Sequence, residues 1–406
     1  MNRAAHLSPE DQTILLLARG DLTPQIQERA LALLATPLRW ELVLERVRVH
    51  QVYPLFFRNF DRLGFLGMPG HVRADLEALC RVNAFHNTLL VEELAHVLTL
   101  LDKAGIPAIP LKGVALAESL YGDVSLRLCT DIDVLVPPRM VAQAFLVLLA
   151  SGYRAEFTER FFVDCWRHRN TEASLTREEQ GFCYILDLHW GVLHGIALDG
   201  GVSEDVWGET RHKAFFDVPA YTLSPEWNLL FLAAHAGHHR WQGLKWLVDI
   251  HEVCIQGSIG WEKLGAKARR LGWQDVLRLS LSVCHTLFST PIPQDFSCHR
   301  VPPQLALFPA KPSLRRWRWE CAFFPLSLLK RPSDKLRYGV RLLLLPTLAE
   351  YRMLRLPSAL NFLYYPLRIL RLGCTWTWWG VCTGVRRLSV LLSALYLKRR
   401  LGSKRR

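Results

Sequence analysis

The segment TDIDVLV, residues 130–136, alternates polar and apolar side chains before two prolines end it. That period of two is typical of a β-strand, in which successive side chains point to opposite faces. Asp131 and Asp133 therefore share one face of the expected strand, about 7 Å apart, while Ile132 and Val134 share the other. Two carboxylates in so apolar a segment are costly unless a positive charge neutralises them. We predict a strand that buries its apolar face and presents two carboxylates to a divalent metal.

The residues upstream extend this pattern. The second half of IPAIPL, residues 106–111, is expected to form a strand, and Lys112 and Gly113 precede a segment with helix propensity. A glycine that opens a helix lets backbone N–H groups approach a phosphate at the positive end of the helix dipole. Lys112 and Arg127 would add the cations that a triphosphate requires. We therefore predict that Lys112, Gly113 and Arg127 bind nucleotide phosphates.

A third strand is expected at YILDLHW, residues 184–190, where Asp187 and His189 share one face. A carboxylate between two leucines is expensive to bury unless it faces a metal or a cation. Mg²⁺, with Mn²⁺ as the alternative, suits such a site because it prefers one or two carboxylates together with phosphate oxygens and water. His189 is a candidate for positioning substrate, or for a hydrogen bond that orients a metal ligand.

A later helical segment contains His235 and His238, three residues apart and able to share a helix face. Neither an H-E-x-x-H pattern nor a cysteine at ligand spacing accompanies them, which disfavours a zinc site. We expect His235 and His238 to position substrate or simply to pack in the core. Trp241 and Trp246 would stack on substrate or fill the core, and Asp249 is a partner for one of the histidines.

The composition indicates a folded chain in a reducing compartment. Half of the 406 residues are hydrophobic, and none of the ten cysteines forms a C-x-x-C pair, which excludes a zinc ribbon or a redox pair of that spacing. The beginning of the chain lacks the apolar stretch of a secretory signal. A cytoplasmic location is therefore expected.

The basic residues are concentrated near the end of the chain. From Lys311 onward there are 21 Lys and Arg residues and three acidic ones, so residues 1–310 carry more acid than base. Arg, Trp and Leu mixed in this way suit the interface of an anionic membrane, which would place the protein at its inner face. RNA is the less favoured partner for the same residues. In a third reading, the tail packs on the rest of the chain and exposes a solvated basic face.

Periodicity and turn signals divide the chain into four regions. We predict a helical N-terminal region (1–104), an α/β core (105–223), a helical substrate-side region (224–310), and a basic, aromatic-rich helical region (311–406).

The motifs LKGVALAESLY, SLRLCTDIDVLV and YILDLHWGVL resemble those of the uncharacterised nucleotidyltransferase family of bacteria, a branch of the DNA polymerase β-like superfamily. The resemblance covers residues 40–350. It implies an α+β fold with a small mixed sheet, a metal held by Asp131, Asp133 and Asp187, and transfer of a nucleoside monophosphate from an NTP. Lys112-Gly113 replaces the Gly-Ser or Gly-Gly step of the wider superfamily, and Asp131 follows Gly113 by 18 residues.

Two other functions remain open at this point. One is a metal-dependent glycosyltransferase, which would use the D-x-D pair but has no need of Asp187 or of the Lys-Gly step. The other is a catalytically silent accessory protein bound to membrane or RNA. The sequence does not identify the NTP, the oligomeric state, or whether the acceptor is a small molecule, a peptide or a protein.

Overall fold

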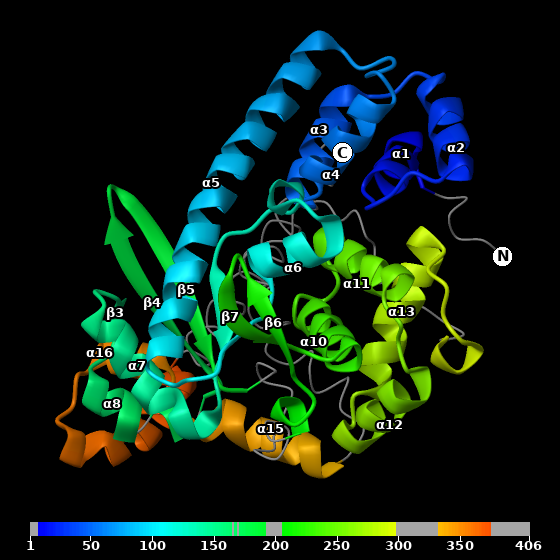
Figure 1. The fold of residues 1–406 in the computed structure, drawn as a ribbon. Helices are drawn as coiled ribbons and strands as arrows, with labels where there is room; N and C mark the ends of the chain where they lie inside the picture. The colour runs from blue at the N-terminus through cyan, green and yellow to red at the C-terminus, as the bar shows by residue number, and fades with distance from the viewer. Residues whose placement is uncertain (1–6, 165, 169, 192–204, 298–331, 375–406) are drawn as a thin grey trace, which may run out of the picture. The chain divides into compact units, whose positions relative to one another are not determined.

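The computed structural model describes residues 7–164, 166–168, 170–191, 205–297 and 332–374 (Figure 1). The chain divides into two compact units, Met1–Lys335 and Leu336–Arg406. The predicted boundary between residues 310 and 311, and most of the basic tail, lie outside the described residues.

Helices occupy the first part of the chain: α1 (Pro9–Leu17), α2 (Pro24–Leu34), α3 (Trp40–Val49), α4 (Tyr53–Arg62) and α5 (Gly70–Lys103). Ser8 and Thr23 cap α1 and α2, since their side chains accept hydrogen bonds from backbone N–H groups of the first turn. The long helix α5 runs past the sheet in Figure 1 and contacts β7 and the 3₁₀ turn η2 (Val124–Leu126).

The main sheet has five strands in the order β1-β2-β5-β4-β3. They are β1 (Ile109–Pro110), β2 (Ile132–Leu135), β3 (Arg154–Ala155), β4 (Glu172–Glu179) and β5 (Phe182–His189). Strands β2 and β5 are parallel, and every other neighbouring pair in this sheet is antiparallel. The predicted α+β fold with a small mixed sheet is therefore confirmed.

Short helices and a second sheet surround these strands. Helix α6 (Gly113–Tyr121) connects β1 to η2, and η3 (Pro138–Met140), α7 (Val141–Ala150), α8 (Glu159–Asp164) and η4 (Trp166–His168) lie between β2 and β4 in sequence. Strands β6 (Arg211–Phe215) and β7 (Val218–Thr222) form a separate two-stranded sheet.

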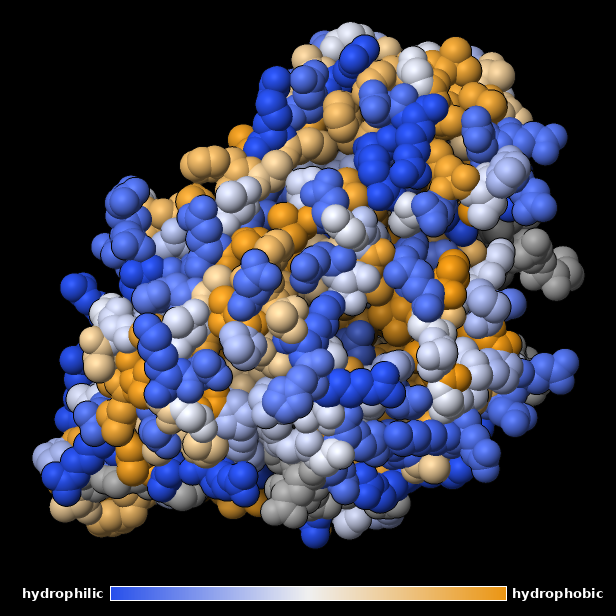
Figure 2. Space-filling view, in the orientation of Figure 1, coloured by the Kyte–Doolittle hydropathy of each residue, from blue (hydrophilic) through white to orange (hydrophobic). Residues whose placement is uncertain are grey.

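The unit continues as a bundle of helices: α10 (Pro225–His238), α11 (Leu244–Gln256), α12 (Trp261–Leu271) and α13 (Gln274–Phe288), followed by η5 (Gln294–Phe296). Apolar side chains fill the interior of this helical bundle, and apolar side chains of the main sheet are buried as well. On the face shown in Figure 2, hydrophilic residues cover most of the surface, and hydrophobic residues are visible in smaller groups between them.

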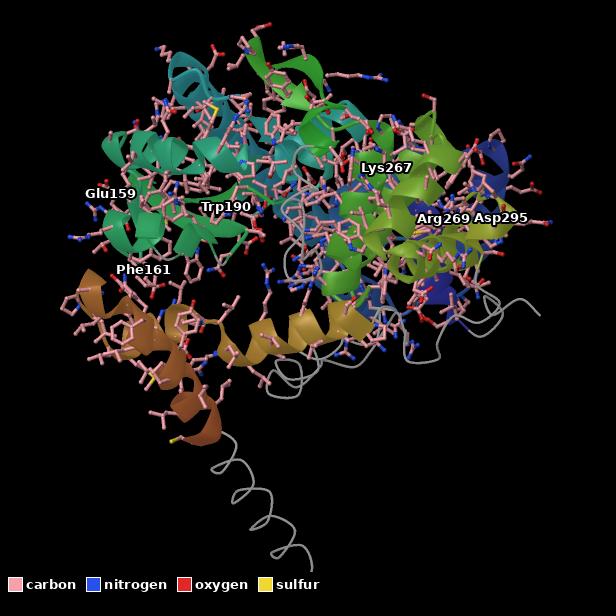
Figure 3. All side chains as sticks on the ribbon, turned by 90° about the horizontal axis from the view of Figure 1, so that it is seen from below. Glu159, Phe161, Trp190, Lys267, Arg269 and Asp295 are labelled. Atoms are coloured by element: carbon pink, nitrogen blue, oxygen red, sulfur yellow. The ribbon has the colours of Figure 1, made fainter. Side chains whose placement is uncertain are left out.

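An aromatic cluster anchors the end of β5. The rings of Phe145 and Phe162 stack with their centroids 3.9 Å apart, and Trp190 packs edge-on against Phe162 at 5.6 Å. Figure 3 labels Trp190, which directly follows β5, and Phe161 of α8. Because Trp190 directly follows His189, this packing fixes the point at which β5 leaves the sheet.

The described part of the second unit consists of α15 (Pro332–Leu344), which begins just before the boundary, α16 (Leu348–Met353) and η6 (Ser358–Leu363). Among the helices that the structure describes, none combines the length and the apolar character needed to cross a membrane.

Candidate active site

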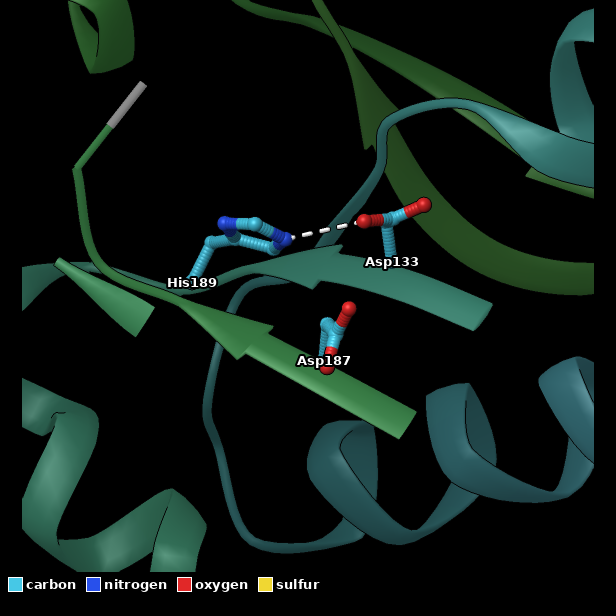
Figure 4. A group of neighbouring side chains, drawn as sticks. All are labelled: Asp133, Asp187 and His189. Carbon is cyan, nitrogen blue, oxygen red and sulfur yellow. Dashed lines mark hydrogen bonds and ion pairs between the residues drawn. The ribbon is translucent and has the colours of Figure 1, made fainter. Parts of the chain in front are cut away.

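Two carboxylates are paired across the centre of the sheet. In the parallel register of β2 and β5, Asp133 lies directly opposite Asp187 (Figure 4). All four residues of β2 are buried, so the strand carries Asp133 into the interior. On the other side of β5, Ser174 of β4 is opposite Asp187 and donates its hydroxyl hydrogen to that carboxylate.

Only one oxygen of the Asp133 carboxylate has hydrogen-bond partners among the described residues. Its Oδ1 lies 2.9 Å from Lys112 Nζ and 2.9 Å from His189 Nε2. Its Oδ2 is buried and has no hydrogen-bond partner among the described residues. Burial disfavours the charged carboxylate, but Lys112 and the hydrogen bond from His189 outweigh burial and lower the pKa of Asp133 to about 2. The buried carboxylate is therefore an anion with one oxygen left to coordinate.

Asp187 has the opposite electrostatic environment. Burial raises its pKa, and the neighbouring Asp133 charge raises it further, while the hydrogen bond from Ser174 offsets part of the effect. Asp187 and Asp133 thus have pKa values that are displaced in opposite directions.

His189 is oriented from both ring nitrogens. Nε2 contacts Asp133, and Nδ1 lies 3.4 Å from Glu172 Oε2. The pairing of β4 with β5 places Glu172 opposite His189, so this second contact follows from strand register. The predicted shared face of Asp187 and His189 is present, and both side chains face the same cavity.

Asp133, Asp187 and His189 form a group that could hold a metal ion. One ligand atom from each residue lies within 4.8 Å of the other two (Figure 4). The two carboxylates suit Mg²⁺ or Mn²⁺. The buried, unpartnered Oδ2 of Asp133 fits such an ion, because a buried anionic oxygen is costly without a partner. Asp131 does not belong to this group, although it lines the same cavity.

Lys112 and Gly113 join the first strand to α6. Gly113 has φ of +60°, and a Cβ added to it would lie 3.3 Å from the backbone oxygen of Asp131. Only glycine adopts that conformation readily, so Gly113 places Lys112 beside the carboxylates. Burial disfavours the charged Lys112, but Asp133 and Asp131 outweigh it and raise the pKa of Lys112. Lys112 lines the cavity, whereas Gly113 is not among the lining residues.

Helix α10 forms the opposite wall of the cavity, which has a volume of about 230 Å³. The cavity is lined by Lys112, Asp131, Asp133, Glu172, Asp187, His189, Phe231, Ala234, His235, His238 and His239. Burial, with nearby Lys112 and His239, lowers the pKa of His235 well below its usual value. Burial and the neighbouring His238 lower the pKa of His239 to about 3. The imidazoles of His235 and His239 are therefore neutral at physiological pH.

The two tryptophans next to α10 differ in role. The Trp241 indole is buried and donates to the Ser280 hydroxyl at 2.8 Å, which makes it a core residue. Trp246 stacks on His239 with ring centroids 4.1 Å apart, and both rings also line a second, smaller cavity. Trp246 therefore supports a histidine of the cavity wall.

Arg127 is not among the residues that line the cavity, contrary to its predicted place beside the phosphates. It is buried, and its Nε and Nη2 donate to Asp249 of α11 at 3.0 to 3.2 Å. The Tyr121 hydroxyl donates to the same carboxylate. Asp249 thus pairs with Arg127 and Tyr121, which corrects the expectation of a histidine partner.

The loop that carries Arg127 is held from three sides. Asn87 of α5 donates to the backbone oxygens of Val124 and Arg127, and Lys245 donates to that of Leu128. These contacts and the Arg127 ion pair fix the chain that leads into β2, and so position Asp131 and Asp133.

Sequence reasoning missed Glu172 and gave His239 no substrate-positioning role. Glu172 belongs to β4, which was not expected as a strand, and only the register with β5 brings it to His189. His239 follows α10 and carries no motif besides its neighbouring histidines. The turn Gln180-Gly181, where both residues have positive φ, was the available signal for the β4–β5 hairpin.

A family model described as uncharacterised nucleotidyltransferase matches residues 36–289. The chain belongs to this family, as its motifs indicated. It is also similar to a crystal structure of an antigenic nucleotidyltransferase-like protein from Paracoccidioides brasiliensis, with 15% identity and a TM-score of 0.30 over 52% of this chain and 94% of that chain. None of the curated proteins matches this chain.

Proposed function

We propose that this chain is a metal-dependent nucleotidyltransferase that moves a nucleoside monophosphate from an NTP to an acceptor. The observation that carries the proposal is the pairing of Asp133 with Asp187 in adjacent parallel strands, where Asp133 keeps one buried oxygen without a partner. Two carboxylates in this arrangement suit a divalent cation and the phosphates that accompany it.

Asp133 and Asp187 would hold the ion, which we take to be Mg²⁺ or Mn²⁺, and His189, whose ring nitrogens contact Asp133 and Glu172, would orient the Asp133 carboxylate. When bound, such an ion stabilises negative charge on the phosphates and on the attacking oxygen. Lys112 brings a positive charge to the same cavity and contacts Asp133. We assign Lys112 to the phosphates and Asp131, at the cavity wall, to the nucleotide or to a further ion.

The proposed reaction needs no covalent intermediate between substrate and enzyme. An acceptor oxygen forms a bond to the α-phosphorus, the bond from that phosphorus to the β-phosphate oxygen breaks, and pyrophosphate leaves. The proton of the acceptor passes to Asp187, whose carboxylate faces the cavity while Ser174 holds it from β4. His235 and His238, on the opposite wall, would position the acceptor.

The test measures transfer of label from α-³²P-NTPs to acceptors. The protein is incubated with Mg²⁺ and one labelled NTP at a time, and each mixture receives a separate pool of small molecules, peptides or proteins as acceptor. Pyrophosphate release is followed in parallel. We expect Asp187→Asn to reduce single-turnover transfer by roughly 10²- to 10⁴-fold, as expected for loss of a general base. The control is Asp75→Asn on the exposed surface of α5, which should transfer normally.

Two results would contradict the proposal. Equal transfer by the wild type and by an Asp133→Asn/Asp187→Asn double variant, with both proteins folded by circular dichroism, would remove the carboxylates from the chemistry. Metal-dependent transfer of sugar from a nucleotide sugar, without any transfer of nucleotide, would assign the site to a glycosyltransferase instead.

A further inference from the structure

The second unit exposes apolar side chains to an unusual degree. More than half of the large hydrophobic side chains that are exposed in the described residues lie between Leu336 and Leu370. Four of them, Leu336, Val340, Leu343 and Leu344, recur at helical spacing along α15 and are 41 to 69% exposed. This spacing places them on one face of the helix.

The interior of the same unit contains buried charged side chains beside the rings of Tyr351 and Tyr364. Glu350 is fully buried and accepts hydrogen bonds from the Thr347 backbone and hydroxyl, at 2.6 and 2.7 Å. Arg368 and Arg371 also donate to Glu350. A domain that faces only water has the reverse arrangement, with aliphatic side chains inside and charges outside. The aliphatic face of this unit is therefore suited to an apolar environment outside the protein.

Charge identifies the kind of environment. Glu350 is one of only three acidic residues from Lys311 to the end of the chain, against 21 Lys and Arg. Since Glu350 is neutralised inside the unit, exposed residues such as Arg337 and Arg355 give the described surface of this unit a positive charge. Apolar and basic side chains together match the interface of a bilayer that contains anionic lipids.

We propose that the second unit docks this chain on an anionic lipid bilayer through its residues 336–374, with the apolar face of α15 entering the interface. With 13 residues, α15 is too short to cross a bilayer, so it would lie in the interface. For residues 336–374, single-stranded RNA fits less well, because it is bound by stacking on exposed aromatic rings. Phe362 is the exposed aromatic side chain between residues 336 and 374, and the remaining exposed apolar side chains there are aliphatic.

The test uses the full chain and two kinds of vesicle, one of phosphatidylcholine alone and one that also contains phosphatidylglycerol. In flotation we expect the protein to bind the anionic vesicles and to dissociate as salt rises, since surface attraction is screened over about 8 to 10 Å near physiological ionic strength. Val340→Asp/Leu343→Asp should weaken this binding at least about tenfold, because charge on the inserted face is costly.

The control is Val82→Asp/Phe85→Asp on α5, which alters two apolar residues of the first unit that are even more exposed. It should leave vesicle binding unchanged, and neither pair should alter the circular dichroism spectrum. Equal loss in the control, equal binding to both kinds of vesicle, or no binding at all would overturn the proposal.

Two further outcomes would assign the surface to another occupant. Tighter binding to single-stranded RNA than to anionic vesicles would make nucleic acid the partner. Conversion of a dimer to a monomer by Val340→Asp/Leu343→Asp, measured by light scattering without lipid, would show that a second copy of the chain covers this face. None of these measurements depends on nucleotide transfer, so membrane docking and the proposed activity are tested separately.

Discussion

Asp133 and Asp187 lie opposite each other on parallel strands, and Lys112 and His189 both contact Asp133. Asp187 is held by the neutral Ser174 hydroxyl. Like charges that face each other across a pair of strands destabilise a sheet. The protein therefore maintains a carboxylate pair whose charge is incompletely compensated by the described side chains.

This relationship predicts how Asp187→Asn affects stability. In the presence of a chelator, the free energy of unfolding of the variant should exceed that of the wild type by up to about 1 kcal/mol, because the facing negative charge is gone. Added Mn²⁺ should stabilise the wild type by mass action and the variant much less. Urea unfolding with and without Mn²⁺ measures both effects. Equal stabilisation of the two proteins by Mn²⁺ would contradict a metal site at this pair.

Gly113→Ala tests the backbone conformation that positions Lys112. Gly113 and Gly122 both have positive φ, of +60° and +67°, but only at Gly113 would a Cβ approach another atom, the Asp131 oxygen at 3.3 Å. Both substitutions should lower the free energy of unfolding, by roughly 1 kcal/mol for the backbone strain alone. Gly113→Ala should cost more than Gly122→Ala in urea unfolding. The interpretation fails if the two costs are the same.

The buried Arg127–Asp249 pair should contribute strongly to stability when one partner is removed. Asp249→Asn leaves the buried guanidinium without its counterion and should cost about 3 to 5 kcal/mol. Replacing both residues, as in Arg127→Met/Asp249→Leu, should recover much of that loss. Glu77→Gln, which breaks the exposed Arg81–Glu77 pair on α5, should cost less than about 1 kcal/mol. Thermal unfolding distinguishes these cases, and a small cost for Asp249→Asn would argue against a structural role.

Alternation along the chain predicted the strands that carry the candidate site. TDIDVLV contains β2 and YILDLHW overlaps β5, and both patterns depend only on local side-chain periodicity. Register is not local. The opposition of Asp133 to Asp187 arises because β5 pairs with β2 in parallel, and neither segment encodes that alignment by itself.

Arg127 illustrates the limit of motif reasoning. An arginine four residues before Asp131 fits a phosphate site, yet its partner Asp249 is 122 residues away in sequence. The second hairpin was equally hard to predict, since its turn is formed by Phe216 and Asp217 at positive φ, without the glycine that usually indicates such a turn. Tertiary packing, rather than local preference, determines the partner of Arg127.

Buried histidines predict a loss of stability in acid. Burial, with nearby Arg19, lowers the pKa of His251 to about 3, and a histidine in the unfolded chain titrates near 6.5. The unfolded state therefore binds the proton first as pH falls. The contribution of His251 is complete above pH 6.5 and declines toward pH 3, by about 1.4 kcal/mol per pH unit at most.

Urea unfolding between pH 7 and pH 4 measures this slope. His251→Asn should flatten it, because the titrating group is gone. Thr290→Val removes the hydroxyl that lies 2.8 Å from His251 Nδ1 but keeps the imidazole, so it should preserve most of the slope. If the slope is the same in the wild type and in His251→Asn, burial of this histidine does not cause the acid sensitivity.

Calorimetric titration with an NTP analogue that cannot be cleaved between the α- and β-phosphates tests the central claim most directly, because it measures metal-dependent nucleotide binding without an acceptor. The wild type should bind with Mg²⁺ or Mn²⁺ present and lose at least about tenfold in affinity in a chelator. Asp133→Asn/Asp187→Asn should bind weakly in either condition, and Asp75→Asn should match the wild type. Undiminished metal-dependent binding by the double variant would contradict a nucleotide site built on these two carboxylates.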